Sequence, residues 1–82
     1  MVGLMLLCHA TANAGNEYDS VEKGISSYEK GDYQAALKHF IDAQIQDPDS
    51  REISYNLGNT YYKIKDYDSA LKNYSEVLKG KD

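Results

Sequence analysis

The chain repeats itself with a period of 34 residues. Residues that recur unchanged one period later include Gly24, Asp32, Tyr33, Ala36, Leu37 and Lys38, which return as Gly58, Asp66, Tyr67, Ala70, Leu71 and Lys72. The same register pairs Tyr28 with Tyr62 and replaces one apolar residue by another at Phe40/Tyr74 and Ala43/Val77. A fixed period of this length is typical of units that cannot bury their apolar faces alone and must stack. Binding is therefore expected on the surface that stacking creates.

Size and charge narrow the classes of function. The 82 residues allow one small domain, and 27% charged with 41% hydrophobic residues is ordinary for a folded globular chain. The formal net charge is −4, and residues 15–50 hold eight acidic side chains against three basic ones. We interpret this acidic half as solvated surface. A basic stripe that could displace counterions from phosphates is missing, so binding to nucleic acid or to anionic membranes is not expected.

Residues 1–14 differ in composition from the rest of the chain. They carry no acidic residue, Lys or Arg, run apolar from Val2 to Cys8 and end in an Ala-x-Ala motif at residues 12–14. This pattern resembles a secretory signal without the usual positive start, so we predict an exported protein, with a cytoplasmic one as the alternative. The apolar run is far shorter than the roughly 20 residues that span a bilayer. Cleavage would remove Cys8, the single cysteine, so no disulfide or zinc site is expected.

Turn signals divide each repeat into two helices. Gly31 suits the left-handed residue that ends a helix, and Asp32 can cap the next one. Between the repeats, Pro48 stops a helix, and Asp49 or Ser50 can cap its successor. Apolar residues within the intervening stretches return every three or four positions, without alternation of the strand type. The sequence therefore predicts an all-α fold with helices at 17–30, 33–46, 51–64 and 67–79.

Two stretches carry the signature of a known family. In the second repeat, Tyr-Asn-Leu-Gly-Asn-Thr-Tyr-Tyr-Lys at 55–63 precedes Asp-Tyr-Asp-Ser-Ala-Leu at 66–71. In the first, Gly-Asp-Tyr-Gln-Ala-Ala-Leu at 31–37 precedes Asp47-Pro48. Both closely resemble the tetratricopeptide repeat. The resemblance implies one domain at 15–82, built from two helix-turn-helix hairpins at 17–50 and 51–82 that stack as a short α-solenoid and bind protein.

Small residues mark the expected helix crossings. Gly58 and Ala70 are small where the two helices of the second unit cross, and Gly24 and Ala36 occupy the same positions in the first. The side chains expected to fill the space around the second crossing are Leu57, Tyr61, Leu71 and Tyr74. The first unit departs from the family at three positions that are usually bulky: Ser20, Lys23 and Ser27.

The first helix instead carries an apolar stripe with heptad-like spacing, formed by Tyr18, Val21, Ile25 and Tyr28. In the family's register these positions face the concave groove. Three interpretations stay open. The stripe is core in an atypical terminal repeat, or the apolar floor of a ligand groove, or a surface covered by a second copy of the chain.

The second unit supplies the other side of the expected ligand site. Helical spacing places five residues on one face, with Asn56 at its edge: Glu52, Tyr55, Asn59, Tyr62 and Lys63. The resemblance implies that this is the concave, ligand-facing side. Asn56 and Asn59 each offer an amide donor and an acceptor, which suits the backbone of an extended peptide. The alternative is that both are ordinary solvated side chains.

We expect neither an enzyme nor a protein with a metal or another cofactor. After cleavage the chain would keep His39 but no cysteine, so the pairing of a nucleophile with a base is not available. Two functions remain. One is binding of a protein or peptide in the concave groove. The other is structural self-association, as a dimer or as part of a larger array, because the helix with Leu71 and Leu78 presents an apolar face that nothing in the sequence covers.

Overall fold

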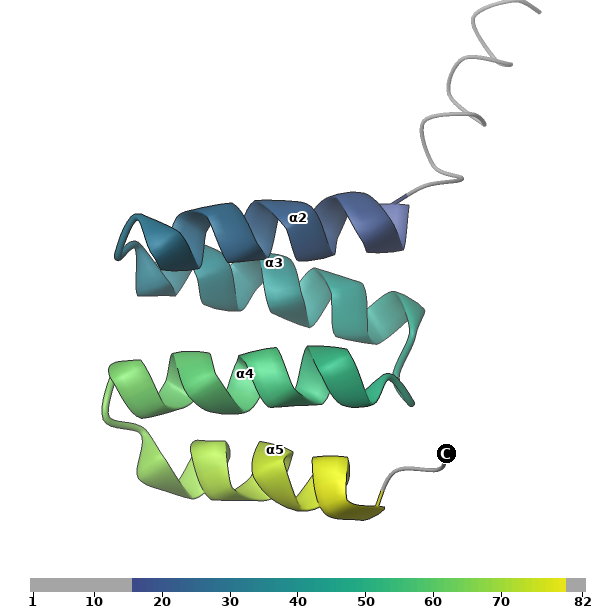
Figure 1. The fold of residues 1–82 in the computed structure, drawn as a ribbon, viewed down its shortest axis with the longest axis vertical. Helices are drawn as coiled ribbons and strands as arrows, with labels where there is room; N and C mark the ends of the chain where they lie inside the picture. The colour runs from purple at the N-terminus through teal and green to yellow at the C-terminus, as the bar shows by residue number, and fades with distance from the viewer. Residues whose placement is uncertain (1–15, 80–82) are drawn as a thin grey trace, which may run out of the picture.

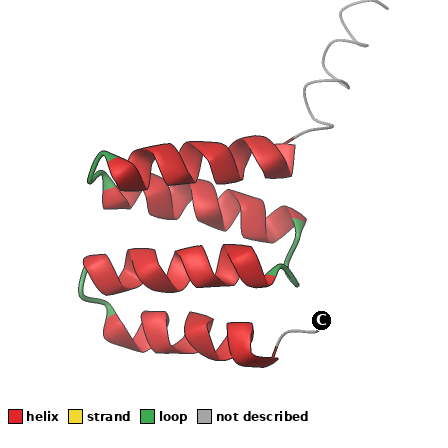
Figure 2. Ribbon diagram, viewed as in Figure 1, coloured by secondary structure: helices red, strands yellow, loops and turns green. Residues whose placement is uncertain are grey.

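The described part of the chain is a stack of four α-helices. The computed structural model describes residues 16–79, with helices Asn16–Glu29 (α2), Tyr33–Gln46 (α3), Arg51–Lys63 (α4) and Tyr67–Lys79 (α5). Successive helices run antiparallel and stack in chain order (Figure 1), joined by short loops (Figure 2). The predicted pair of helical hairpins is confirmed, with helix ends displaced by one residue in α2 and α4. The predicted signal segment at 1–14, including Cys8, lies outside the described residues.

Both hairpins turn in the same way. In the first, Gly31 has a φ of 81°, and Asp32 N–H donates to the Ser27 carbonyl over 2.9 Å. One period later, Lys65 has a φ of 68°, and Asp66 N–H donates to the Tyr61 carbonyl over 2.9 Å. This six-to-one hydrogen bond around a left-handed residue is the Schellman arrangement that ends helices. The second turn therefore holds lysine in a conformation that favours glycine.

Lys65→Gly is expected to stabilise the fold by about 1 kcal/mol. The left-handed conformation costs a residue with a Cβ atom about 1–2 kcal/mol, and glycine avoids this cost. Glycine's greater conformational freedom in the unfolded chain offsets part of the gain. Urea unfolding followed by circular dichroism measures the change. Lys72→Gly is the control: Lys72 lies exposed in the middle of α5, where glycine should instead cost up to about 1 kcal/mol. A loss of stability in Lys65→Gly would contradict the assigned turn.

Side-chain caps begin three of the helices. Asp32 Oδ1 accepts from Ala35 N–H, Ser50 Oγ from Ile53 N–H and Asp66 Oδ1 from Ser69 N–H, each over 3.2 Å. Each cap satisfies a backbone donor that the helix itself leaves unpaired. The expected cap at Asp32 is confirmed, and Ser50 rather than Asp49 caps α4. These loops fix the chain direction of each helix.

The glycines allow aromatic rings to lie directly on the facing helix. A Cβ atom at Gly24 would come within 2.5 Å of the Phe40 ring, and one at Gly58 within 2.5 Å of the Tyr74 ring. Ala36 and Ala70 are fully buried at the same two crossings. The expected close approach of the two helices in each hairpin is therefore confirmed, and it follows the sequence register.

The core lies between the two hairpins. Its fully buried members come from α3 and α4: Ala36, Phe40, Ala43, Ile53 and Leu57. Thr60 is also fully buried, and its hydroxyl donates to the Asn56 carbonyl over 2.7 Å, so its polar atom is satisfied inside the helix. Stacking of α4 on α3 thus creates the apolar interior that neither hairpin has alone.

Leu71 does not fill the space around the second crossing, so that expectation was wrong. Its side chain is 67% exposed, whereas Leu37, one period earlier, is partly buried against the core. The difference arises because α4 covers the outer face of α3, while within residues 16–79 no helix covers the same face of α5. Leu57 is buried as expected, and Tyr61 and Tyr74 are partly buried.

Candidate ligand groove

A groove runs between α2 and α4 above the core; we call it the α2–α4 groove. It has a volume of about 220 Å³ and is lined by Ile25, Tyr28 and Glu29 from α2, Phe40 from α3, and Asn56 and Asn59 from α4. α2 and α4 are the first helices of successive units that share one register, so residues of both helices meet beside Phe40 of α3. Four predicted site residues, Ile25, Tyr28, Asn56 and Asn59, are therefore brought together. Apolar side chains line the first wall and amides the second.

The two asparagine amides differ in what they can offer. Tyr74 Oη donates to Asn59 Oδ1, so one of the two lone pairs of that oxygen is engaged, while the Nδ2 group stays a donor. Partial burial raises the pKa of the Tyr74 hydroxyl, which keeps the donating form. Asn59 is thereby held in place by the adjacent helix. Asn56, partly buried three residues earlier on α4, is the other amide that faces the groove.

The apolar stripe on α2 is divided between core and groove. Val21, Ile25 and Tyr28 pack against the core cluster, and Ile25 and Tyr28 also line the α2–α4 groove. Tyr18 is 72% exposed near the start of the helix. The core interpretation thus describes part of the stripe, and the interpretation as a ligand-binding floor stays a prediction.

The remaining predicted site residues lie beside the groove. The Tyr55 ring stands 6.2 Å from the Tyr74 ring, and the Tyr62 ring 5.4 Å from that of Tyr67, measured between centroids. Lys63 Nζ lies 6.0 Å from the centroid of the Tyr33 ring, at the outer limit of a cation–π contact. These contacts tie α4 to its neighbours. None of these three residues is among those that line the groove.

Acidic side chains gather where α2 and α4 begin. The pKa of the Glu17 carboxyl is raised above its ordinary value by partial desolvation and by the neighbouring Asp47 carboxylate, with a smaller contribution from Glu52. Because α2 and α4 run in the same direction, their first turns lie at the same end of the two helices (Figure 1). Glu52, the last predicted site residue, belongs to this acidic end.

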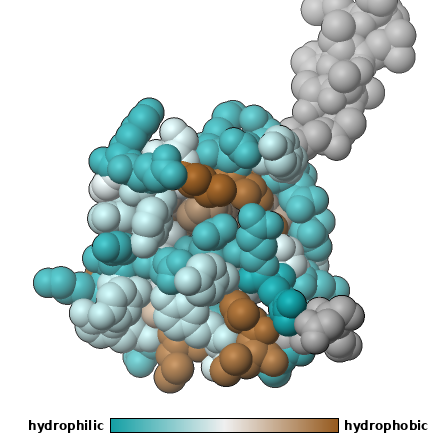
Figure 3. Space-filling view, in the orientation of Figure 1, coloured by the Kyte–Doolittle hydropathy of each residue, from teal (hydrophilic) through white to brown (hydrophobic). Residues whose placement is uncertain are grey.

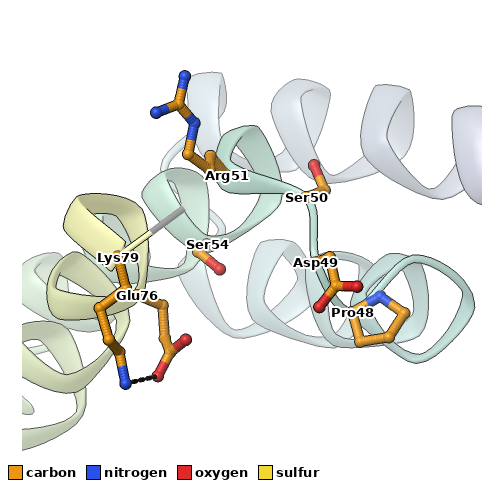
Figure 4. A pocket seen from close by; sticks show the side chains of 7 residues that line it. All are labelled: Pro48, Asp49, Ser50, Arg51, Ser54, Glu76 and Lys79. Atoms are coloured by element: carbon orange, nitrogen blue, oxygen red, sulfur yellow. Dashed lines mark ion pairs between the residues drawn. The ribbon is translucent and has the colours of Figure 1, made fainter. Parts of the chain in front are cut away.

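A second hollow, of about 240 Å³, lies between the α3–α4 loop and the end of α5 (Figure 4). It is lined by Pro48, Asp49, Ser50, Arg51, Ser54, Glu76 and Lys79. Lys79 Nζ pairs with a Glu76 carboxylate oxygen over 3.2 Å. This hollow mixes charges of both signs and has few apolar residues. It therefore lacks the apolar wall and the facing amide wall of the α2–α4 groove.

Two features of the groove were not predicted. Glu29 lines it, although the sequence gave no reason to separate this side chain from the other exposed acids. Phe40 closes its floor, and the glycine at position 24 of the facing helix was the signal that could have indicated this. Among residues 16–79, no group of three or more His, Cys, Asp or Glu side chains could hold a metal ion. None of the four described helices is long and apolar enough to cross a membrane.

Comparison with known proteins agrees with this architecture. The profile of the tetratricopeptide repeat family matches residues 27–80. Human intraflagellar transport protein 70A is 39% identical over 67 residues, and human intraflagellar transport protein 70B is 36% identical over 64. Mouse intraflagellar transport protein 70A1 is 31% identical over 81 residues, or 95% of this chain. The human alignments cover 77% of this chain, which spans about a tenth of each relative's length. The chain belongs to the tetratricopeptide repeat family.

Proposed function

We propose that the α2–α4 groove binds an extended segment of a partner protein. The observation that carries the proposal is the juxtaposition of Ile25 and Tyr28 with Asn56 and Asn59 over the Phe40 ring. The apolar wall would contact ligand side chains, and the amides would bind its backbone irrespective of sequence. Family membership supports a protein-binding role. The relatives are named for intraflagellar transport, but the match covers a tenth of their length, so the groove's own chemistry has to define the partner.

Acidic side chains give the ligand a charge preference: Glu29 lines the groove itself, and Glu17, Asp47 and Glu52 lie beyond it. Glu17 precedes Ile25 by eight residues, a distance of about 12 Å along a helix. An extended peptide covers this distance in about four residues. The preferred ligand is therefore a segment with an apolar side chain over Ile25 and Tyr28 and a Lys or Arg about four positions away, near Glu17, Asp47 and Glu52. Acidic segments are disfavoured.

The affinity is expected to be modest. Each net hydrogen bond contributes about 0.5–1.5 kcal/mol, and two asparagines offer few of them. Binding in the micromolar range, or about −8 kcal/mol, is the expected result. The affinity should decrease at high salt, because the acidic side chains Glu17 and Glu52 are exposed to solvent and salt screens their charge.

The test begins with selection from a random peptide library against the full chain, followed by titration of a selected peptide into isotope-labelled protein. Backbone amide shifts are expected at residues 25–28 and 56–59. Asn56→Ala should weaken binding by about three- to tenfold, the equivalent of one lost hydrogen bond. The matched control is Asn73→Ala, since Asn73 lies in a hollow formed with α3 and α5 on the other face of α4. Shifts confined to α3 and α5, or equal affinity for Asn56→Ala, would contradict the groove assignment.

A second function is favoured by a separate observation. The outer face of α5 exposes Tyr67, Leu71 and Leu78, and several exposed large apolar side chains on one helix are typical of an interface. This face lies outside the α2–α4 groove and does not need the same partner. Structural assembly through α5 is thus compatible with peptide binding between α2 and α4.

A further inference from the structure

The exposed apolar surface of the described chain is of two kinds. The space-filling view shows hydrophobic surface at the α5 end of the molecule (Figure 3), and α5 exposes Leu71 and Leu78. The other kind is aromatic and lies on α4, where Tyr55 is 53% and Tyr62 58% exposed. An exposed tyrosine offers a large, rigid ring together with a hydroxyl that can form a hydrogen bond. The two α4 tyrosines are therefore candidates for contact with a ligand.

The two rings flank one of the groove amides. Tyr55, Asn59 and Tyr62 are spaced by four and three residues, which places them on one face of α4; we call them the α4 row. Tyr74 contacts the Tyr55 ring and donates to Asn59 Oδ1. Tyr67 contacts the Tyr62 ring. Contacts from α5 thus hold the row in place, and Asn59 joins it to the α2–α4 groove.

The spacing of the rings favours one conformation of an unfolded ligand segment. Tyr55 and Tyr62 are seven residues apart, which is about 10.5 Å along a helix. A polyproline II helix presents the same side every three residues, or every 9.3 Å or about that at its rise of about 3.1 Å. A β-strand presents the same side about every 6.6 Å, and its second repeat lies at about 13 Å. The polyproline II repeat therefore matches the two rings within about 1 Å, and the strand repeat does not.

An α-helical ligand would match the spacing over two turns, but it would not match the polar groups. Its backbone N–H and carbonyl groups are paired with each other, so the amides of Asn56 and Asn59 would have no backbone partner. A polyproline II segment has no internal hydrogen bonds, and its carbonyls are free to accept from amide and phenol groups. Proline also lacks a backbone N–H, so it needs no acceptor from the groove.

The same conformation suits a site that has few anchors. A polyproline II segment is already ordered before it binds, so less conformational entropy is lost on binding. Its proline rings are apolar and flat enough to pack on tyrosine rings, as in other aromatic grooves that bind proline-rich segments. A basic residue beside the prolines would be attracted by Glu29, which lines the groove, and by the exposed Glu52.

We propose that the α2–α4 groove and the α4 row together bind a proline-containing segment in the polyproline II conformation, with prolines three residues apart on the rings of Tyr55 and Tyr62. Carbonyls of the segment accept hydrogen bonds from Asn56 and Asn59. This ligand class rests on the proposed binding of a partner segment in the groove. It adds the kind of segment that binds and the two rings that select it.

Three nine-residue peptides with an N-terminal fluorophore test the proposal by fluorescence anisotropy with the full chain. The first has proline at positions 2, 5 and 8, leucine at 3 and 6, alanine at 1, 4 and 7, and arginine at 9. The second has the same composition with its prolines at 2, 4 and 6. In the third, valine replaces each proline of the first. The first peptide is expected to bind about fivefold more tightly than the second and about tenfold more tightly than the third.

Variants of one ring of the α4 row test where the prolines bind. Tyr62→Leu is expected to weaken binding of the first peptide by about tenfold, whereas Tyr62→Phe, which keeps the ring, should weaken it by about threefold or less. Tyr62 is exposed, so both variants should show the circular dichroism of the parent. Leu71→Ala is the matched control, because it shortens an exposed apolar side chain outside the row and should leave the affinity unchanged.

Equal affinity of the three peptides, or unchanged affinity in Tyr62→Leu, would overturn the proposal. So would a library-selected peptide that becomes helical when it binds. If none of the three peptides binds while a library-selected peptide still shifts the amides of residues 25–28 and 56–59, the polyproline II ligand is excluded and the groove function stands. If no peptide of either kind shifts those amides, both proposals fail.

Discussion

Phe40→Ala is expected to remove most of the stability of the fold. The Phe40 side chain is 1% exposed, lies on Gly24 of α2 and belongs to the cluster that includes Ile53 and Leu57 of α4. It therefore connects both hairpins. Truncating a buried phenylalanine costs about 3–5 kcal/mol, which is comparable to the whole stability of a domain this small. Urea unfolding followed by circular dichroism should show little or no cooperative transition.

Tyr74→Ala is the matched control, because Tyr74 occupies the same position one period later. Its ring lies on Gly58 but is only partly buried, since the described chain has no helix beyond α5 that covers it. A clearly smaller loss of stability is expected. If both variants unfolded at the same urea concentration as the parent, the core would not lie between the hairpins. If Tyr74→Ala were the more damaging change, the second crossing rather than the stacking of units would hold the fold together.

The positions of the helices were predictable because their signals are local. Gly31 ends α2, Asp32 caps α3 and Ser50 caps α4, each within a few residues of the backbone groups that it satisfies. Repetition of the turn in the second unit then follows from the register. The one anomaly, Lys65 in the left-handed conformation, is also visible in the sequence once the two turns are aligned.

The burial of individual apolar residues was harder to predict. Leu37 and Leu71 are the same residue in the same register, yet one packs against the core and the other is exposed. Periodicity shows which helix face is apolar, but the neighbouring helix decides whether that face is buried. The sequence was interpreted in two ways for Leu71, as part of the second crossing and as part of an uncovered apolar face, and its exposure agrees with the second.

The repeat register predicted which side chains of α2 and α4 lie near one another in the candidate groove, but not the hydrogen bonds that they make. Ile25 and Tyr28 come to face Asn56 and Asn59 because α2 and α4 occupy equivalent places in successive units. The hydrogen bond from Tyr74 to Asn59 depends on side-chain geometry across a helix crossing, which spacing alone does not determine. It occupies one of the two lone pairs of Asn59 Oδ1, and it leaves Asn56 as the more informative site for mutation.

Gly24→Leu should be the second most damaging substitution, with a cost of about 3 kcal/mol or more. A Cβ atom at this position would lie 2.5–2.8 Å from three carbon atoms of the Phe40 ring, well inside van der Waals contact. Phe40 is 1% exposed and belongs to the core cluster, so its ring can shift only by giving up core contacts or by entering the α2–α4 groove that it lines. Overpacking of this kind usually costs about 1–3 kcal/mol, and the loss of core contacts places the cost at the upper end or beyond. Chemical unfolding of the variant measures the loss.

Gly58→Leu makes the same change one period later and should cost less, about 1–2 kcal/mol. Tyr74 can turn toward solvent there, at the expense of its hydrogen bond to Asn59 and its contact with Tyr55. Ser26→Leu, at an exposed position of α2, controls for the change in helix propensity and should stay within about 0.5 kcal/mol of the parent. Helix propensity alone predicts that leucine stabilises α2 at position 24. Unfolding of Gly24→Leu at a higher urea concentration than the parent would therefore show that α2 and α3 do not cross at Gly24 and Phe40.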